Sequence, residues 1–437
     1  MISQLHLQNF KSWRDTGPMR FAPLTGFFGT NSSGKTSILQ FLVMMKQTAE
    51  SNDQARVLHT GDKNSYIDLG TFYDLIHNHQ VPGQLEFVID WELNLPTRKV
   101  VFEAINDLNQ PLKLEIIIQK LRFEATIQGD ENKVQVEHFV YHFEEYSLGM
   151  RRKSDEEGYD LVIENIPPST IVPHSTPLTN PIKSYDFPSP IGDRFFFLGG
   201  AFERLMKDIS YLGPLREYPS RIYPWSGERP QDVGTRGEWA IPALLASPPE
   251  VKQQVARWLK TLGLIHSFDL RPIAENRREY ETVVKLSPQS AEVPITDVGF
   301  GISQILPVLV LCYYVPEKSI IILEQPEIHL HPAVQANLAD VFVEVIKTRG
   351  VQIILESHSE HLLRRLQRRI AEEQLQPEET ALYFTSINEG VSNLAELDID
   401  TFGNIRNWPE NFFGDELGDL EAMTEAAIQR RLNGGQA

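Results

Sequence analysis

The stretch Gly29-Thr30-Asn31-Ser32-Ser33-Gly34-Lys35-Thr36 decides the fold of this chain. A short apolar run, Leu24 to Phe28, leads straight into it, and apolar residues at helical spacing follow from Ile38 to Met45. This order predicts a buried strand, a tight glycine-rich loop and a helix. The chain is therefore expected to have an α/β core built around the loop.

The same eight residues match the pattern G-x-x-x-x-G-K-[ST] of a phosphate-binding loop, or P-loop. Its glycines let successive N–H groups face an anion, Lys35 neutralises phosphate oxygens, and Thr36 offers a hydroxyl to Mg²⁺. The competing interpretation is a glycine-rich turn before a helix, which the complete motif in this setting disfavours. We predict that ATP with Mg²⁺ binds here. The predicted nucleotide contacts are Gly29, Asn31, Ser32, Ser33, Gly34, Lys35, Thr36 and Ser37.

A second apolar run, Ile320 to Leu323, ends in the acid Glu324. A carboxylate at the end of a buried strand lies beside the Mg²⁺ of a P-loop protein, so we predict that Glu324 and Thr36 hold the metal. An acidic strand end that faces water is the alternative for this run taken alone. The presence of the P-loop favours the metal site.

Two further segments carry candidate site residues. Val351 to Ser359 predicts another buried strand, and His358 at its carboxyl end is expected near the terminal phosphate. A capping or core histidine is the commoner meaning of one isolated histidine. Thr296 to Pro307 is a glycine-rich turn that enters an apolar helix, with Pro307 expected in the first turn. That second pattern is weak by itself, because glycine-rich helix starts occur in many folds.

Composition limits the partners and the compartment. The formal net charge of −18 opposes nonspecific binding to nucleic acid, whose affinity comes largely from Lys and Arg. The arginine cluster from Arg364 to Arg369 leaves a local basic groove open, although a solvated helix face with i,i+4 ion pairs is the simpler interpretation. The single cysteine, Cys312, lies in an apolar run and is expected to pack in the core. No membrane span or secretory signal is visible, so a cytoplasmic protein is expected.

The pattern along the chain predicts a split core. Residues 1–80 form its first part, 81–200 a β-rich insertion that ends in a Pro-rich loop from Pro167 to Pro190, and 201–290 a helical or irregular insertion. Residues 291–400 return to the strand and helix alternation of a parallel sheet, and 401–437 form a tail. The segment Gln84 to Ile163 is expected to be an antiparallel sheet with one wet face.

With these four motifs in this order, the chain resembles the ATP-binding-cassette ATPases of the SMC, RecF and overcoming-lysogenization-defect group. It looks most like bacterial relatives that carry an E-Q-P-E-x-H-L-H-P motif after the second strand, here Glu324 to Pro332. The resemblance implies a P-loop head of cassette type with an antiparallel β subdomain and a helical insertion. It also implies a homodimer, or a larger even oligomer, that sandwiches two ATP molecules. In such a dimer a signature segment of the second subunit completes the site, here Gly299, Gly301, Ser303 and Gln304.

The chain departs from this group at the catalytic position. Cassette ATPases usually place a glutamate after the strand-end acid to activate water, and Gln325 stands there instead. An amide cannot accept that proton, and losing a general base typically costs on the order of 10² to 10⁴ in rate. The expected catalytic residues are therefore Gln325, Glu327 as a substitute base, and His358. His329 and His331 have metal-pair spacing but are expected to shape the turn. The resemblance also implies a loop with a glutamine, the Q-loop, after the first helix. No such glutamine is evident, although Tyr66 to Gly70 lies where this loop would be sought.

Three functions remain open at this stage. The first is an ATP-dependent dimerising switch that controls a partner effector, for which the resemblance favours a nuclease in defence against phage. The second is a nuclease that carries its own metal-binding Toprim domain, but the chain after His361 is too short for that domain. The third is a RecF-like repair ATPase that binds DNA through a basic groove including Arg216, Arg221 and Arg229.

Overall fold

The computed structural model describes most of the chain. The described residues are 1–53, 55–93, 98–105, 111–130, 133–154, 157–166, 185–188, 191–409, 412–413 and 416–432. The Pro-rich loop expected from 167 to 190 lies outside them, apart from residues 185–188.

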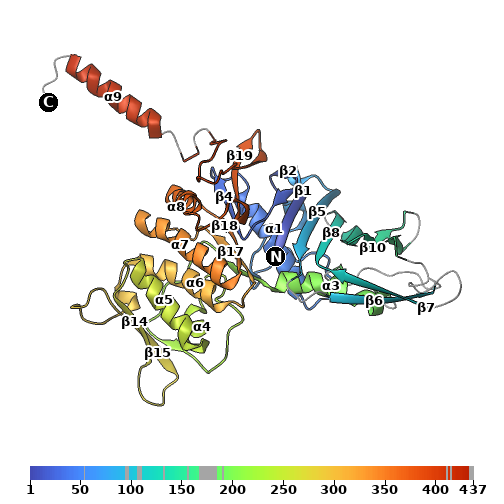
Figure 1. The fold of residues 1–437 in the computed structure, drawn as a ribbon, viewed down its shortest axis with the longest axis horizontal. Coiled ribbons are helices and arrows are strands. Elements are labelled where there is room, and N and C mark those ends of the chain that lie inside the picture. The colour runs from blue at the N-terminus through green and yellow to red at the C-terminus, as the bar shows by residue number, and fades with distance from the viewer. Residues whose placement is uncertain are drawn as a thin grey trace.

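A six-stranded sheet forms the α/β core, as the sequence predicts (Figure 1). Its strands in spatial order are β12 (Ile209–Leu212), β17 (Ile320–Glu324), β18 (Gln352–Glu356), β4 (Leu24–Gly29), β19 (Thr380–Asn388) and β20 (Val391–Glu396). Neighbouring strands run parallel, except for the edge hairpin of β19 and β20. The carboxyl ends of parallel strands lie at the same edge of a sheet. Side chains from distant parts of the sequence therefore meet at that edge.

Helices cover both faces of this sheet and explain its apolar sequence. The helices are α1 (Lys35–Glu50), α2 (Phe72–Leu75), α3 (Ile191–Lys207), α4 (Ala240–Ala246), α5 (Pro249–Thr261), α6 (Phe300–Tyr314), α7 (Pro332–Arg349), α8 (Glu360–Ala371) and α9 (Glu416–Leu432), with short 3-10 turns at His77–His79, Ile295–Asp297 and Pro377–Glu379. Ile320 and Ile322 join the core cluster that contains α1, whereas Ile321 and Leu323 join the cluster that contains α6 to α8. Every residue of β17 is buried because successive side chains enter opposite cores.

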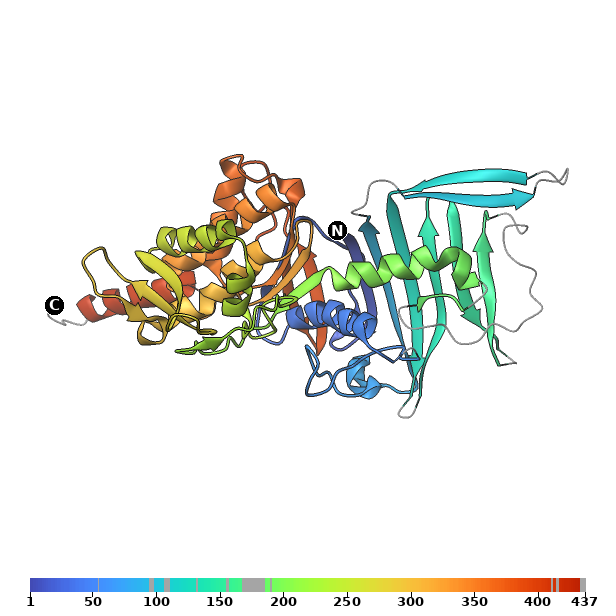
Figure 2. The same ribbon diagram turned by 90° about the horizontal axis from the view of Figure 1, so that it is seen from below.

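A second, eight-stranded sheet is antiparallel and carries the wet face that the sequence predicts. Its strands are β1 (Ile2–Phe10), β2 (Trp13–Asp15), β3 (Met19–Arg20), β5 (Gly83–Glu92), β8 (Lys120–Gly129), β9 (Val134–Phe143), β10 (Tyr146–Arg152) and β11 (Tyr159–Glu164). Figure 2 shows α1 and α3 lying across one face of it. On that face Phe87, Phe123 and Phe202 pack with ring centroids 4.9 to 5.8 Å apart. Burial of these rings joins the sheet to the α/β core.

Smaller elements complete the chain. They are the sheet of β13 (Tyr223–Pro224), β14 (Ser267–Pro272), β15 (Glu279–Lys285) and β16 (Val293–Pro294), and the hairpin of β6 (Arg98–Ile105) and β7 (Pro111–Ile118). Figure 1 shows α9 standing apart from the body. The range 201–290, expected as a helical or irregular insertion, contributes α4 and α5, the small antiparallel sheet, and also the core strand β12.

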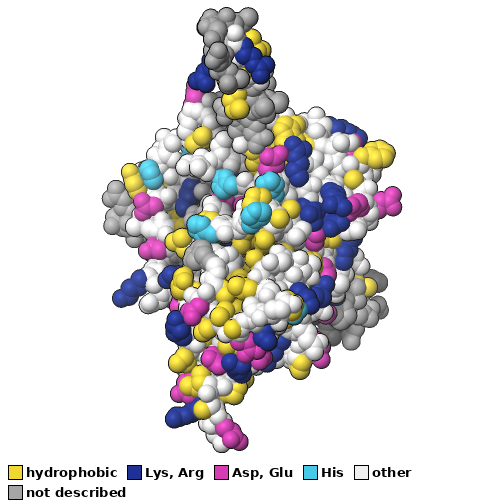
Figure 3. Space-filling view, turned by 90° about the vertical axis from the view of Figure 1, so that its left-hand side faces the viewer, with side chains coloured by type: hydrophobic (Ala, Val, Ile, Leu, Met, Phe, Trp, Pro, Cys, Tyr) yellow, Lys and Arg dark blue, Asp and Glu magenta, His cyan; other side chains and the backbone are white. Residues whose placement is uncertain are grey.

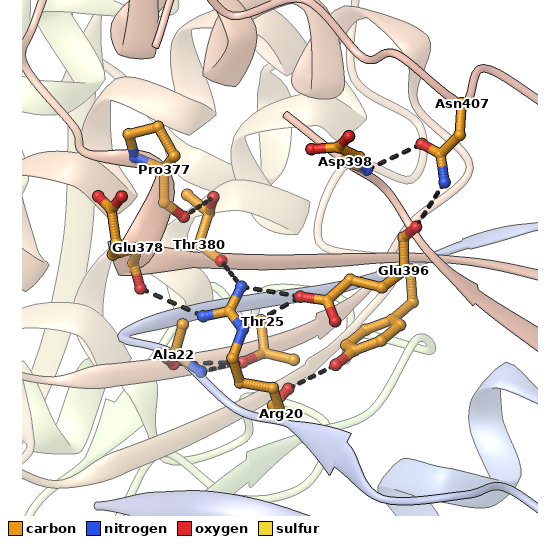
Figure 4. A network of polar contacts seen from close by, with 10 residues as sticks. Arg20, Ala22, Thr25, Pro377, Glu378, Thr380, Glu396, Asp398 and Asn407 are labelled. Atoms are coloured by element: carbon orange, nitrogen blue, oxygen red, sulfur yellow. Dashed lines mark hydrogen bonds and ion pairs between the residues drawn. The ribbon is translucent and has the colours of Figure 1, made fainter. Parts of the chain in front are cut away.

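A polar network fastens the first segment of the chain to its last third (Figure 4). Arg20, at the end of β3, donates hydrogen bonds to the carboxylate of Glu396 and to the backbone carbonyls of Glu378 and Thr380. Asn407 then bonds the backbone of Glu396 and of Asp398. The network supports β19, which pairs with the P-loop strand β4, and the edge strand β20.

The structure corrects the expected place of Pro307. Helix α6 begins at Phe300, so Pro307 lies inside the helix and not in its first turn. An interior proline removes one helical hydrogen bond. Its ring packs against Gly237, where an added Cβ would lie 2.5 Å from Pro307, so a neighbouring loop closes over this part of the helix. Among the described residues, none of the helices combines the length and apolar character that a membrane span requires.

Candidate nucleotide-binding site

The P-loop joins β4 to α1 as the sequence predicts. β4 ends at Gly29 and α1 begins at Lys35, with Gly34 as its N-cap. The backbone takes positive φ values at Gly29 (132°), Ser32 (60°) and Gly34 (92°), which curl the loop. No side chain caps the first turn of α1, so its N–H groups are available to an anion.

Both glycines of the motif have a positive φ, and neighbouring atoms also leave no room for a side chain at either position. An added Cβ on Gly29 would lie 2.0 Å from the backbone oxygen of Thr385, and one on Gly34 would lie 2.8 Å from the side chains of Ser12 and Trp13. The indole Nε1 of Trp13 donates to the carbonyl of Gly34 at 3.0 Å. The loop is therefore held from outside by β2 and β19.

The side chains of the loop divide into exposed and internal ones. Asn31 and Ser32 are exposed. Ser33 is buried, and its hydroxyl bonds the Thr30 carbonyl and the Thr385 hydroxyl, so it supports the loop from within. Ser37 is half-buried in the first turn of α1, with its N–H bonded to the Gly34 carbonyl.

Lys35 folds over the loop. Its Nζ donates to the carbonyls of Gly29 at 3.2 Å and Thr30 at 2.6 Å. Burial lowers the pKa of Lys35, while the charge of Glu356 opposes that change. A cation held over a ring of backbone N–H groups is suited to phosphate oxygens.

Thr36 contacts an acid that the sequence reasoning did not assign. Its Oγ1 donates a 2.6 Å hydrogen bond to Oε2 of Glu356 at the end of β18. Glu356 is paired in register with Glu324 on the adjacent strand β17. The signal was present in the sequence, because Glu356 ends an apolar run in the same way as Glu324 does.

The two carboxylates fit a divalent cation. Glu324 and Glu356 are 5% and 3% exposed, and burial together with the charge of Glu356 raises the pKa of Glu324 to about 7. The Tyr211 hydroxyl donates to Oε1 of Glu324 at 2.9 Å and orients it. A Mg²⁺ ion in a P-loop site takes one or two carboxylates, a hydroxyl, waters and phosphate oxygens. Thr36, Glu324 and Glu356 would supply the protein part of that set.

The expected catalytic residues lie at the same edge of the sheet. Gln325 turns the chain after β17 with a φ of 43°, and its N–H bonds the Glu356 carbonyl. Glu327 is buried, and its Oε1 accepts a 2.7 Å hydrogen bond from the backbone N–H of His358. Burial raises the pKa of Glu327. Within the described residues its Oε2 has no hydrogen-bond partner.

His358 lies between the two acidic positions and the P-loop. Its Nε2 is 3.9 Å from Oε1 of Glu356, and its side chain is partly exposed. Burial, and then the charge of Lys35, lower the pKa of His358. The imidazole is therefore neutral at pH 7, so it can donate or accept a hydrogen bond but does not form an ion pair with Glu356.

Other histidines at this edge shape turns and line the surface. Nδ1 of His331 accepts from the N–H of Ala333 and caps α7, and His329 adopts a φ of 60°. His329, His331, His358 and His361 are exposed, and Figure 3 shows histidine side chains close together on one face. In the part of the chain that the structure describes, no group of three or more His, Cys, Asp or Glu is arranged to hold a metal ion.

The signature segment divides between surface and interior. Gly299 is exposed, and an added Cβ there would meet no atom within 4 Å. Gly301 is half-buried, and an added Cβ there would lie 3.7 Å from Leu330 and 3.9 Å from the His329 carbonyl. Within the single chain Ser303 is 7% exposed and Gln304 is 2% exposed. The expected contact of this segment with a second subunit stays a prediction.

The structure also shows which loops lie near the ends of the core strands. The Tyr66 ring lies 5.1 Å from Nζ of Lys46 near the carboxyl end of α1, roughly 15 Å along the helix from Thr36, so Tyr66 itself is not beside the P-loop. Instead, the loop after β12 reaches the carboxyl end of β17. There Arg216 donates from Nη2 to the Glu324 carbonyl at 3.3 Å.

The arginines expected in a basic groove are engaged within the chain. Arg365 and Arg369 both bond Asp340, Arg364 pairs with Glu360, and Arg368 pairs with Glu372. The last pair is the i,i+4 ion pair that the sequence indicated. Arg221 pairs with Asp297, Arg229 lies over the Tyr314 ring, and Arg216 is buried.

A search of curated proteins found no match. Solved structures with a similar fold include an SMC head domain from Thermotoga maritima, which is 12% identical, covers 91% of this chain and 99% of its own, and has a TM-score of 0.42. An SMC head bound to the C-winged helix domain of ScpA is also 12% identical, with 91% and 98% coverage and a TM-score of 0.45. An SMC head with an extended coiled coil, bound to the C-terminal domain of ScpA derived from Pyrococcus furiosus, is 12% identical, with 98% and 99% coverage and a TM-score of 0.40.

Two protein families match the sequence itself. A family described only as a protein of unknown function matches residues 375–423. The AAA ATPase domain family matches residues 1–164 and 248–363, together more than half of the chain. The protein therefore belongs to the AAA ATPase domain family.

Proposed function

We propose that the protein binds ATP with Mg²⁺ and acts as a molecular switch, in which nucleotide closes a homodimer that controls a partner protein. The observation that carries this proposal is the group formed by Lys35, Thr36 and the two buried acids Glu324 and Glu356 at one edge of the core sheet. Together they offer a cation for phosphate and oxygen ligands for Mg²⁺.

The residues at the catalytic position favour a switch over a motor. The Gln325 amide stands where a general base is needed and cannot accept a proton. Glu327 is the substitute, but one of its oxygens is held by the His358 backbone and burial favours its protonated form. Nucleotide binding, with hydrolysis as a slow reset, then sets the state of the protein.

The surface around the site supports a contact between two copies. Gly299 is open at the start of α6, with nothing within 4 Å of an added Cβ. The loop after β12 carries large exposed apolar side chains, Leu215, Tyr218 and Ile222. Exposed apolar groups beside a polar site are typical of protein contacts. The sequence resemblance favours a nuclease of an antiviral system as the effector, and the paired arginines make direct DNA binding the less supported alternative.

The test measures ATP binding, ATP turnover and oligomeric state with Mg²⁺ for the wild type, Lys35→Ala and Gln325→Glu. Lys260→Ala, at an exposed position of α5, is the matched control. We expect the wild type to bind ATP, to form dimers and to turn over slowly, and Lys35→Ala to lose all three. Failure of the wild type to bind ATP would contradict the proposal. Binding without any change in oligomeric state would contradict the dimer.

A further inference from the structure

Arg216 is the buried cation nearest to the end of the β17 strand. It lies in the loop that follows β12 and is 7% exposed. Backbone hydrogen bonds fix this loop on both sides of it, from Gly213 N to Thr235 O and from Glu217 N to Arg236 O, each 2.8 Å long. The guanidinium is therefore presented by a backbone that is already ordered.

The guanidinium is incompletely bonded. Its Nη2 donates to the Glu324 carbonyl, but among the described residues its Nε and Nη1 have no hydrogen-bond partner. Burial lowers the pKa of Arg216 to about 10, so the group is still a cation at pH 7. A buried cation with two unused N–H groups is unfavourable unless an anion or ordered water meets it.

The neighbouring acids Glu324 and Glu327 do not accept hydrogen bonds from these N–H groups of Arg216. Oε1 of Glu324 accepts from the Tyr211 hydroxyl, and Oε1 of Glu327 accepts from the His358 backbone. Oε2 of Glu327 is itself without a partner, so it is not within bonding distance of Arg216. The missing acceptor is expected to come from outside the chain.

The position of Arg216 identifies that acceptor. Its partner carbonyl belongs to Glu324, which is in register with Glu356, and Glu356 in turn bonds Thr36 of the P-loop. In P-loop proteins the terminal phosphate lies between the P-loop and this strand end. The planar fork of arginine suits two oxygens of one phosphate.

We propose that Arg216 donates hydrogen bonds to the terminal phosphate of the ATP bound in its own chain, and so distinguishes ATP from ADP. The inference rests on the proposed ATPase site and adds a contact that the P-loop motif does not contain. The rival role is structural, in which ordered water joins Arg216 to Glu327 and the arginine only positions that acid.

The experiment measures the dissociation constants of Mg-ATP and Mg-ADP for the wild type, Arg216→Ala and Arg216→Lys by calorimetry. Arg349 supplies the control, because it is a half-buried arginine whose Nη1 and Nη2 bond the carbonyls of Cys312 and Val315. Thermal unfolding of every variant shows whether it is folded. If Arg216→Ala is unstable, the charge-conserving Arg216→Lys gives the answer.

We expect Arg216→Ala to weaken ATP binding by about 10- to 100-fold, the value of a charge-assisted contact, and to leave ADP binding within about threefold. Arg216→Lys should recover part of the loss, and Arg349→Lys should leave the ratio of the two constants unchanged. Equal weakening of ATP and ADP, or no weakening, would overturn the contact with the terminal phosphate. Absence of nucleotide binding by the wild type would instead overturn the proposed function, and this inference with it.

Discussion

The hydroxyl of Thr36 donates its 2.6 Å hydrogen bond to Glu356, and not to Glu324. The two acids end adjacent parallel strands, and Glu356 is the one on the strand next to β4, which leads into the P-loop. Strands in a sheet are about 4.8 Å apart, so the nearer strand brings its carboxylate within reach of the loop. The proposed metal-binding end of the site therefore contains two acids.

The first prediction concerns Glu356→Gln. Removal of one negative charge beside Thr36 should weaken Mg-ATP binding by about tenfold or more, because a charge-assisted ligand is lost. Binding of ATP without Mg²⁺ should not weaken, since the same charge repels the triphosphate. Titrations of nucleotide with and without Mg²⁺ measure both effects.

Glu360→Gln is the control for this variant, because Glu360 lies nearby in α8 and, among the residues that the structure describes, its ion pair is with Arg364. Equal Mg-ATP affinity in Glu356→Gln and the wild type would show that Glu356 holds Thr36 but takes no part in metal binding.

A second prediction separates the two candidate bases. Gln325→Glu should raise the rate of hydrolysis, by up to about 10² to 10⁴, because a carboxylate of the same shape accepts the proton that the amide cannot. Glu327→Gln should slow the wild type if Glu327 is the present base. Single-turnover rates with saturating Mg-ATP test both. If neither variant changes the rate, the base is another group.

A third prediction concerns Gly29→Ala. Its φ of 132° and the 2.0 Å approach of the Thr385 oxygen leave no room for a methyl group, so unfolding free energy should fall by about 3 kcal/mol or more. Urea unfolding provides the measurement. Gly200→Ala in α3 is the control, because an added Cβ there meets nothing within 4 Å. A loss of stability as large in Gly200→Ala would show that the packing around Gly29 is not the cause.

The fourth prediction tests the contact between α7 and α8. Asp340 accepts from Arg365 and Arg369, and these bonds hold the pKa of Arg369 above its usual range. Asp340→Ala should lower the unfolding free energy by about 1 to 3 kcal/mol, because two half-buried guanidinium groups lose their shared carboxylate, although Arg369 keeps its pair with Glu372. Asp398→Ala, which breaks only an exposed pair with Arg406, should cost less than about 1 kcal/mol. An equal loss of unfolding free energy in the two variants would show that burial of the ion pair does not increase its contribution to stability.

A fifth prediction concerns the reactivity of Cys312. Burial raises the pKa of the Cys312 thiol to about 12, so almost no thiolate exists at pH 8. Iodoacetamide should leave the native protein unmodified for hours and react within minutes in denaturant, as mass spectrometry would show. Rapid labelling of the native protein would mean that α6 opens frequently.

Local features of the site could be predicted from the sequence. The strand, loop and helix around Lys35, the strand that ends at Glu324 and the strand before His358 all appear where their patterns place them. These features depend on backbone preferences and on the alternation of apolar residues over a few positions. The antiparallel sheet from Gln84 onward could also be predicted, because its strands show the same local alternation of apolar residues.

Contacts between distant residues were decided by the tertiary structure. Thr36 and Glu356 are 320 positions apart, and Arg216 and Glu324 are 108 apart. Their meeting depends on the strand order of the sheet, which places β12 and β18 on either side of β17. The inward turn of Gln304 likewise depends on which face of α6 meets the core. The sequence by itself predicted which groups would bind phosphate. The packing of strands and helices decided which acid and which arginine lie near them, because no local pattern encodes the order of strands in a sheet.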